Sequence, residues 1–376
     1  MFRTVEGRGS GVERQGTPQA RVLGVGTANP PHRYGQAEVQ TLVRSMFDRL
    51  PGIERLMGVF ENTGIEGRYL GAPLEWFAHD HSFEEKNTLW FGAALEISLE
   101  ASRKALEQAG VGAEEVGAVV MVTTTGIATP NLESYLIQRL GIPLSAVRLP
   151  LWGLGCAGGA AGLARSAELA QHRPGQVVLM VAVELCSLTF LRNDISKSNL
   201  IATSLFADGA AAVVVGAGRE SGNRAGRGET AWASSPEIVG GFTRLLPGSY
   251  DVMGWDVAQG GLKVRFSQSI PSLVQGELGS LIHDGLESHG LTAADVGAWV
   301  LHPGGAKVLA AYREGMGIDD LSHEASWSVL RKYGNMSSPT VLFVLEEMLG
   351  RVGSGTDGVL LALGPGFSAE GVVLRW

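Results

Sequence analysis

A cysteine lies at a turn between an apolar stretch and a run of helix-forming residues. Cys156 stands in LWGLGCAGGAAGLARSAELA, residues 151–170, with Gly153 and Gly155 before it and small residues after it. The alanine and leucine spacing predicts a helix that begins just after the cysteine. Backbone N–H groups and the helix dipole favour a thiolate there, so we expect a lowered thiol pKa and a nucleophilic role. The alternative is a small buried apolar residue.

Two further polar side chains stand where elements end or begin. His302 follows the apolar stretch AWVL and precedes a turn of sequence PGG, which predicts an imidazole at the end of a strand. Asn335 precedes a predicted helix, for which Ser337 or Ser338 would be the N-cap and Pro339 would lie in the first turn. The alternatives are a hydrogen-bonded core histidine and an amide that only caps locally.

Cysteine, histidine and asparagine together suit the chemistry of thioesters. The thiolate of Cys156 would accept an acyl group. N–H groups of His302 and Asn335 would polarise a second thioester and stabilise the enolate formed when it loses carbon dioxide. A cysteine protease differs, because its histidine must activate water. We expect no metal site, since the cluster His79-Asp80-His81 lies in a polar segment typical of a solvated loop.

The composition is that of a large α/β protein. The chain has 376 residues, 45% of them hydrophobic, with 53 glycines, enough for one large core or two of ordinary size. Its 30 Lys and Arg against 38 Asp and Glu give a net charge of −8. This charge argues against nucleic acid as a partner.

The two cysteines bear on the cellular compartment. Cys156 and Cys186 are the only cysteines, and no apolar stretch of signal-peptide length stands near the N-terminus. We therefore expect a reducing cytoplasm, with a disulfide between these two residues as the alternative. No apolar window is long enough for a membrane span.

A repeated segment divides the chain. ALEQAGVGAEEVGA at residues 105–118 aligns with GLESHGLTAADVGA at 285–298, with seven of the fourteen residues identical. Each copy ends a helical pattern, turns at a glycine and enters an apolar strand, which indicates a duplicated unit. The expected division is a disordered tail at 1–20, an N-terminal half at 21–217, a surface linker at 218–236 and a C-terminal half at 237–376.

Three near-continuous apolar runs predict buried strands. They lie at 177–184, 210–216 and 358–364. Runs of this kind are typical of strands covered on both faces, so we expect mixed sheets between layers of helices.

Six motifs in order along the chain resemble the type III polyketide synthases, the chalcone and stilbene synthase family of the thiolase fold. They are GTANPPHRY, GLGCAGG, SLFADGAAAVVVG, HPGG, YGNMSSPT and GPGFSAE, and the resemblance runs from about residue 21 to Trp376. It implies an α/β thiolase fold with five layers, αβαβα, built from the two halves, and a homodimer. The segment ELCSLTF at 184–190 is similar to bacterial alkylpyrone and alkylresorcinol synthases.

The resemblance also implies an activity. Cys156 would take an acyl group from an acyl-CoA starter, and His302 with Asn335 would promote decarboxylation of malonyl-CoA. The lengthened chain would return to Cys156 for further extensions and then cyclise to a pyrone or a resorcinol. CoA thioesters are the substrates in this family, so the resemblance implies no separate cofactor and no obligatory acyl carrier protein.

Several residues are implied to shape the cavity and the starter preference. Phe206 resembles a gatekeeping phenylalanine, with an ordinary core aromatic as the alternative. The second gate of the plant enzymes falls on Val264, two positions before Phe266, so that gate is altered or absent. Cys186 would border a tunnel for a fatty acyl starter; the alternative is that it only packs in its strand. The other expected cavity residues are Thr125, Thr129, Ser337, Gly364, Pro365 and Gly366.

The contacts to the CoA phosphates depart from the plant pattern. Two basic positions of that pattern fall on Gly58 and Asn62, which leaves Arg49, Arg55 and Arg68 as the expected contacts.

Three alternative functions follow from the same residues. The first is a β-ketoacyl synthase III, which elongates once onto a carrier protein. The others are a non-catalytic thiolase-fold scaffold and a thiol redox sensor that bridges Cys156 to Cys186.

Overall fold

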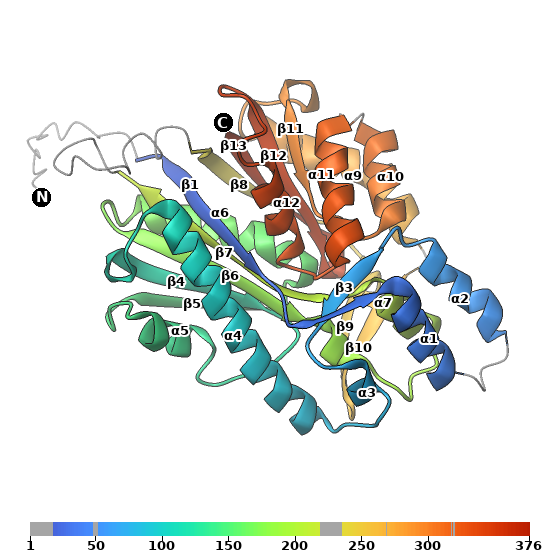
Figure 1. Ribbon diagram of the computed structural model, residues 1–376. Helices are drawn as coiled ribbons and strands as arrows, with labels where there is room; N and C mark the ends of the chain where they lie inside the picture. The colour runs from blue at the N-terminus through green and yellow to red at the C-terminus, as the bar shows by residue number, and fades with distance from the viewer. Residues whose placement is uncertain (1–17, 48–51, 219–234, 268, 317, 319) are drawn as a thin grey trace, which may run out of the picture.

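The computed structural model describes residues 18–47, 52–218, 235–267, 269–316, 318 and 320–376 (Figure 1). The strands are β1 (Ala20–Ala28), β2 (His32–Gly35), β3 (Gly67–Leu70), β4 (Val116–Thr123), β5 (Val147–Trp152), β6 (Val177–Leu185), β7 (Asp208–Ala217), β8 (Glu237–Leu245), β9 (Met253–Ala258), β10 (Gly261–Phe266), β11 (Ala298–Leu301), β12 (Asp357–Gly364) and β13 (Ser368–Arg375). The α-helices are α1 (Gln36–Met46), α2 (Ile53–Glu61), α3 (Leu74–Phe77), α4 (Phe83–Ala109), α5 (Glu133–Leu140), α6 (Gly158–Gln171), α7 (Lys197–Leu205), α9 (Ile270–Glu287), α10 (Ala306–Met316), α11 (Asp320–Tyr333) and α12 (Thr340–Met348). Short 3-10 turns are η1 (Ala113–Glu115), η2 (Gly155–Ala157), η3 (Cys186–Thr189), η4 (Ala293–Asp295) and η5 (Pro365–Phe367).

The main sheet contains strands from both halves of the chain. Its order is β11-β12-β13-β8-β1-β7-β6-β4-β5. Strands β4, β5 and β6 pair in parallel, as do β11 and β12, and the other neighbours are antiparallel. The two groups of strands meet where β1 pairs with β8, through Ala20 with Ile238 and Arg21 with Glu237. The sheet is therefore mixed, as expected.

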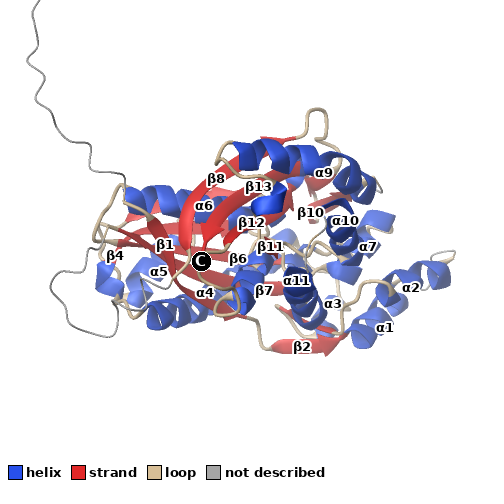
Figure 2. Ribbon diagram, turned by 90° about the horizontal axis from the view of Figure 1, so that it is seen from above, coloured by secondary structure: helices blue, strands red, loops and turns tan. Residues whose placement is uncertain are grey.

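Helices cover the strands in three layers. Helix α4 packs on β1, β6 and β7, and α9 packs on β8 and β13 (Figure 1). Between the two groups of strands lies α6, which contacts β4, β6 and β7 as well as β8, β12 and β13 (Figure 2). Helix α12 lies there too, since it contacts β1 and β7 as well as β11 and β12. This arrangement confirms the five-layered αβαβα architecture.

The two copies of the repeat have the same local structure. Helix α4 ends at Gly110, in the left-handed conformation, and is followed by η1 and β4. Helix α9 is followed by Gly290, also left-handed, and then by η4 and β11. The duplicated unit read from the sequence is therefore a helix, a 3-10 turn and a strand.

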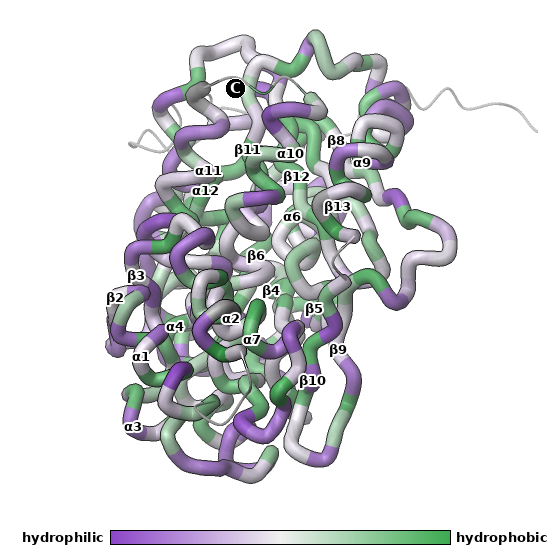
Figure 3. Tube along the Cα trace, turned by 90° about the vertical axis from the view of Figure 1, so that its right-hand side faces the viewer, coloured by the Kyte–Doolittle hydropathy of each residue, from purple (hydrophilic) through white to green (hydrophobic). Residues whose placement is uncertain are grey.

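Apolar residues concentrate along the strands. Figure 3 shows hydrophobic residues in the interior and hydrophilic residues on the outer helices and loops. Every residue of β4, β6 and β7 is buried, because helices cover both faces of these strands. Among the described residues, no helix has the length and apolarity needed to cross a membrane.

The domain division stays a prediction. Most of the tail predicted at 1–20 and of the linker predicted at 218–236 lies outside the described residues.

Candidate active site

Cys156 lies in η2, directly before α6, and is 8% exposed. The turn needs its glycines, because Gly153 and Gly155 have φ values of 90° and 48°. A Cβ on Gly155 would stand 2.8 Å from Pro365, so the loop after β12 packs directly on the cysteine turn. The predicted helix start just after Cys156 is confirmed.

His302 is the residue that follows β11. Its backbone N–H donates to Leu361 of β12 at 2.9 Å, which fixes the main chain at the end of the sheet. The side chain is 2% exposed, and neither ring nitrogen has a hydrogen-bond partner in the described protein. Burial lowers the pKa of His302 to about 3, so the imidazole is neutral at physiological pH.

Asn335 is held by four hydrogen bonds, two of them with the main chain around Phe206. Its N–H donates to Leu205 O at 3.0 Å, and its C=O accepts from Ala207 N at 2.9 Å. The side-chain oxygen accepts from Ser337 N at 2.8 Å, and Nδ2 donates to Gly304 O at 3.1 Å. The second N–H of the amide is not used by these bonds, and the side chain of Asn335 also interacts with the Cys156 thiol.

His302 and Asn335 are connected through Gly304. The N–H of Gly304 donates to His302 O at 3.0 Å, and its carbonyl accepts from Asn335 Nδ2. The main chain of His302 and the side chain of Asn335 are therefore connected after the C-terminal end of β11.

The predicted serine cap of α12 is wrong. The N-cap is Pro339, and no side chain caps the helix. Ser337 adopts a left-handed φ of 61°, and Ser338 Oγ donates to Glu184 Oε1 at 3.0 Å. The buried carboxylate takes the hydroxyl that would otherwise cap the helix.

The expected lowering of the Cys156 pKa is also wrong. Burial raises the pKa of the thiol to about 11, and the charge of Glu184 acts in the same direction. Interactions with the side chains of Ser337 and Asn335 lower it, but by less. Cys156, Asn335 and Ser337 are thus in one buried site, and the resting cysteine is a neutral thiol.

A mainly apolar cavity lies beside this site. Phe206, Cys186 and Val264 line it, and the ring of Phe206 stacks on Trp255 at 5.9 Å and contacts Phe266 at 5.6 Å. Most of the other lining residues are apolar: Val39, Leu42, Val43, Met46, Leu70, Leu74, Phe77, Phe190 and Ala202. Cys156, His302 and Asn335 do not line it. Phe206 connects this cavity to the site of Asn335, because its main chain forms a β-bridge with Asn335.

Six expected cavity residues do not line this cavity: Thr125, Thr129, Ser337, Gly364, Pro365 and Gly366. Thr125 is buried and donates to Glu184 Oε2 at 2.7 Å, and it lines a smaller pocket of about 240 Å³. Thr129 is exposed on the loop after β4 and lines neither space.

The expected CoA contacts are only partly described. Arg68 does not fit, because its guanidinium is buried and Nη1 donates to Thr203 O at 2.6 Å and to Phe206 O at 2.7 Å. Arg55 lies in α2, and Arg49 falls outside the described residues.

Sequence analysis missed two residues at the site. Trp255 of β9 lines the cavity, and no local pattern marks it. Glu184 is buried in β6, and its Oε2 accepts from Thr124 N at 3.0 Å and Thr125 N at 2.9 Å. A charged residue within the apolar run VVLMVAVEL was the available signal, since a buried acid requires partners.

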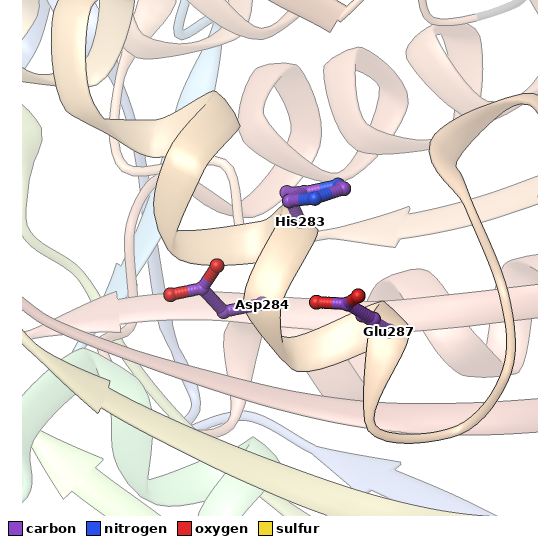
Figure 4. Close-up of side chains that lie close together, drawn as sticks. All are labelled: His283, Asp284 and Glu287. Atoms are coloured by element: carbon purple, nitrogen blue, oxygen red, sulfur yellow. The ribbon is translucent and has the colours of Figure 1, made fainter.

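Three potential metal ligands gather on the surface of α9. His283, Asp284 and Glu287 lie close together on the exposed surface of α9 (Figure 4). His81 stacks on Trp76, with ring centroids 3.8 Å apart. None of these residues is Cys156, His302 or Asn335.

Comparisons with known proteins identify the family. The sequence matches the family models for chalcone and stilbene synthases, the N-terminal domain at residues 10–219 and the C-terminal domain at 237–376. The chain belongs to the chalcone and stilbene synthase family. As a member of this family, it is a type III polyketide synthase and an acyltransferase.

Several relatives of this synthase have names that specify a product. A 1,3,6,8-tetrahydroxynaphthalene synthase of Streptomyces peucetius is 39% identical over 359 residues, covering 94% of this chain and 93% of the relative. The α-pyrone synthesis polyketide synthase-like Pks18 of Mycobacterium tuberculosis is 27% identical over 366 residues, covering 95% and 91%. The solved 1,3,6,8-tetrahydroxynaphthalene synthase of Streptomyces coelicolor matches with a TM-score of 0.86 and 26% identity, covering 95% and 99%.

Proposed function

We propose that this synthase extends an acyl group on Cys156 by repeated decarboxylative condensation with malonyl-CoA. The observation that carries the proposal is the meeting of Cys156, Asn335 and Ser337 in one buried site, with His302 joined to Asn335 through Gly304. In the loading step, Cys156 Sγ attacks the carbonyl of an acyl-CoA starter, and CoA leaves as a thiol with the proton of the cysteine. The imidazole of His302 is neutral, so one of its ring nitrogens can donate a hydrogen bond to the thioester carbonyl.

The extension step uses the same groups on malonyl-CoA. The C–C bond to the carboxylate breaks, carbon dioxide leaves, and the electron pair forms an enolate on the remaining acetyl-CoA. An N–H of the neutral His302 and the second N–H of Asn335 donate to the enolate oxygen. The enolate carbon then attacks the Cys156 thioester, and the sulfur leaves. The lengthened acyl-CoA reloads Cys156 for the next extension.

The starter in this proposal is a fatty acyl-CoA, and the product is a pyrone or resorcinol. The support is the apolar wall of the cavity next to Phe206 and Cys186. Each methylene buried there stabilises the complex by about 0.8 kcal/mol, so affinity rises with tail length until the cavity is full. Coenzyme A thioesters are the substrates, with no further cofactor and no carrier protein.

A second candidate product is a fused aromatic ring system. It is favoured by the 39% identity to the Streptomyces peucetius protein, which is named for a tetrahydroxynaphthalene. The cavity supports the first candidate, because an unsubstituted polyketide intermediate carries oxygen on alternate carbons and gains less from apolar walls.

We also propose a homodimer. Strand β5 ends the sheet, so one side of its backbone has no neighbouring strand. Trp152 of this strand and Ile127 of the nearby loop are both half exposed, and Thr129 is on the same loop. A second copy on this face would cover these side chains and bring Thr129 towards the partner subunit.

Both cysteines are free thiols, which supports a reducing cytoplasm as the location.

The test is incubation with labelled malonyl-CoA and acyl-CoA starters of graded length, followed by product masses. We expect pyrones or resorcinols that retain the starter tail, and Cys156→Ala should abolish them while Cys186→Ala still forms them. A single β-keto product would indicate the β-ketoacyl synthase alternative. A naphthalene without an acyl tail would indicate the second candidate, the fused aromatic product. Failure to form any product, with a Cys156–Cys186 bridge under mild oxidant, would indicate the redox sensor.

A further inference from the structure

A buried lysine connects two segments of the cavity wall. Lys86 lies in the first turn of α4 and is 9% exposed. Its Nζ donates to Phe190 O at 2.8 Å and to Gly260 O at 3.3 Å. Phe190 lines the cavity, and Gly260 forms the tip of the β9–β10 hairpin, which contributes Trp255 and Val264 to the same wall. One ammonium group therefore connects the η3 side of the cavity to the hairpin.

The two carbonyls are the partners that Lys86 has in place of an ion pair. None of the ion pairs among the described residues involves Lys86, and the charge of Asp80 acts on it only from a greater distance. A buried ammonium is costly unless hydrogen bonds satisfy it, whereas a methionine would fill the same space without a charge. The hydrogen bonds from Lys86 to Phe190 O and Gly260 O therefore explain why a lysine stands at this buried position.

The hairpin tip rests on the same region through apolar contacts. A Cβ on Gly260 would stand 3.3 Å from Leu191 Cδ2, and one on Gly261 would stand 3.4 Å from Phe83 Cδ2. These distances show that the hairpin tip lies close to Leu191 and to the start of α4, but apolar packing of this kind is not directional. The hydrogen bonds of Lys86 are directional, so they fix the position of the tip relative to Phe190.

We propose that Lys86 is a positioning residue for starter selection. By holding the β9–β10 hairpin against Phe190, it sets the separation of two walls of the acyl cavity and thereby the length and bulk of the acyl tail that the cavity accepts. The residue touches neither Cys156 nor the reacting atoms. This inference rests on the proposed function, because it assumes that an acyl tail occupies the cavity.

The variant Lys86→Met keeps the apolar stem and removes the ammonium. With a graded series of acyl-CoA starters, we expect the ratio of kcat/KM between the best and the worst starter to fall about tenfold. Decarboxylation of malonyl-CoA without starter should stay within about twofold. Lys86→Arg should restore the selectivity, because its guanidinium also offers several donors. Lys104→Met, on the exposed part of the same helix, is the matched control and should change neither reaction. An unchanged length profile in Lys86→Met, or equal losses in elongation and decarboxylation, would overturn the proposal.

Hydrogen exchange separates a failure of this inference from a failure of the proposed function. In Lys86→Met, the amides of β9 and β10 should exchange at least tenfold faster than in the wild type, while those of β4 and β12 stay protected. This measurement needs no substrate. If the wild type elongates no acyl-CoA, the proposed function fails even where the exchange result holds. If the hairpin amides of Lys86→Met stay fully protected, Lys86 does not position the hairpin.

Discussion

Ser338 donates a hydrogen bond of 3.0 Å to Glu184, a residue of the other half of the chain. The second oxygen of Glu184 accepts from Thr124 N, and Thr124 Oγ1 accepts from Gly155 N at 3.0 Å. One buried carboxylate thus connects the loop of Asn335 to the turn of Cys156. This acid therefore helps to set the relative position of Cys156 and Asn335.

The pH dependence of stability tests the state of Glu184. Burial raises its pKa to about 7, above the value of about 4.3 expected in the unfolded chain. Between these values the folded protein binds a proton that the unfolded chain has released, so the contribution of this group is lost as pH rises from 5 to 8. Relative to Glu184→Gln, the wild type should lose about 2 to 3 kcal/mol of unfolding free energy over that range. Urea unfolding of both proteins at the two pH values measures this, and parallel pH dependence would contradict it.

Asn335→Asp tests the amide as a hydrogen-bond donor. Aspartate has nearly the same shape, but it lacks the N–H and its negative charge repels the enolate. We expect decarboxylation of malonyl-CoA to slow by about 10²- to 10³-fold. Asn131→Asp is a matched control, because Asn131 uses only its side-chain oxygen, which accepts from Leu132 N. An Asn335→Asp enzyme with wild-type rates would exclude the assigned role.

Alkylation of Cys156 tests whether the resting thiol is neutral. Since burial raises its pKa to about 11, the thiolate fraction increases with pH throughout the range from 7 to 10. The rate of modification by iodoacetamide should rise about tenfold per pH unit over that range. Peptide mass spectrometry separates Cys156 from Cys186. A plateau below pH 8 would show instead that His302 already holds the thiol proton.

The ring of Trp255 should limit the length of the acyl tail. It lines the cavity and stacks on Phe206, so Trp255→Ala should enlarge the space and shift the preferred starter towards longer chains. Trp255→Phe should give an intermediate preference. Val257→Ala changes an exposed residue of the same strand and should leave the preference unchanged. Starter competition assays with product masses measure the shift, and identical profiles for all three variants would argue against a limiting role.

The turn at Cys156 and the strand end at His302 could be predicted from the sequence because their signals are local. Glycines around Cys156 and the strand before His302 mark turns and element ends, and the structure has these features where the patterns predict them. The repeat likewise predicted two similar halves. These signals come from residues adjacent in the sequence, so a single sequence is enough to show them.

The features that were missed depend on contacts between distant segments. The pKa of Cys156 depends on its total burial, which no helix dipole reveals. Ser338 leaves the N-cap because Glu184, from the other half, accepts its hydroxyl. Arg68 is basic but buried under α7, and the place of Trp255 requires the hairpin to fold onto Phe206. In each case the sequence shows the residue type but not how deeply the residue is buried or which distant residues it contacts.

The bridge between Phe206 and Asn335 has a consequence for engineering this enzyme. Main-chain bonds on both sides of Phe206 hold Asn335, so a substitution that displaces the backbone at the ring also displaces the amide. Variants at position 206 that accept new substrates should therefore also have lower turnover. Changes on the hairpin leave this main-chain connection intact. Redesign of the accepted starters is best begun at the hairpin.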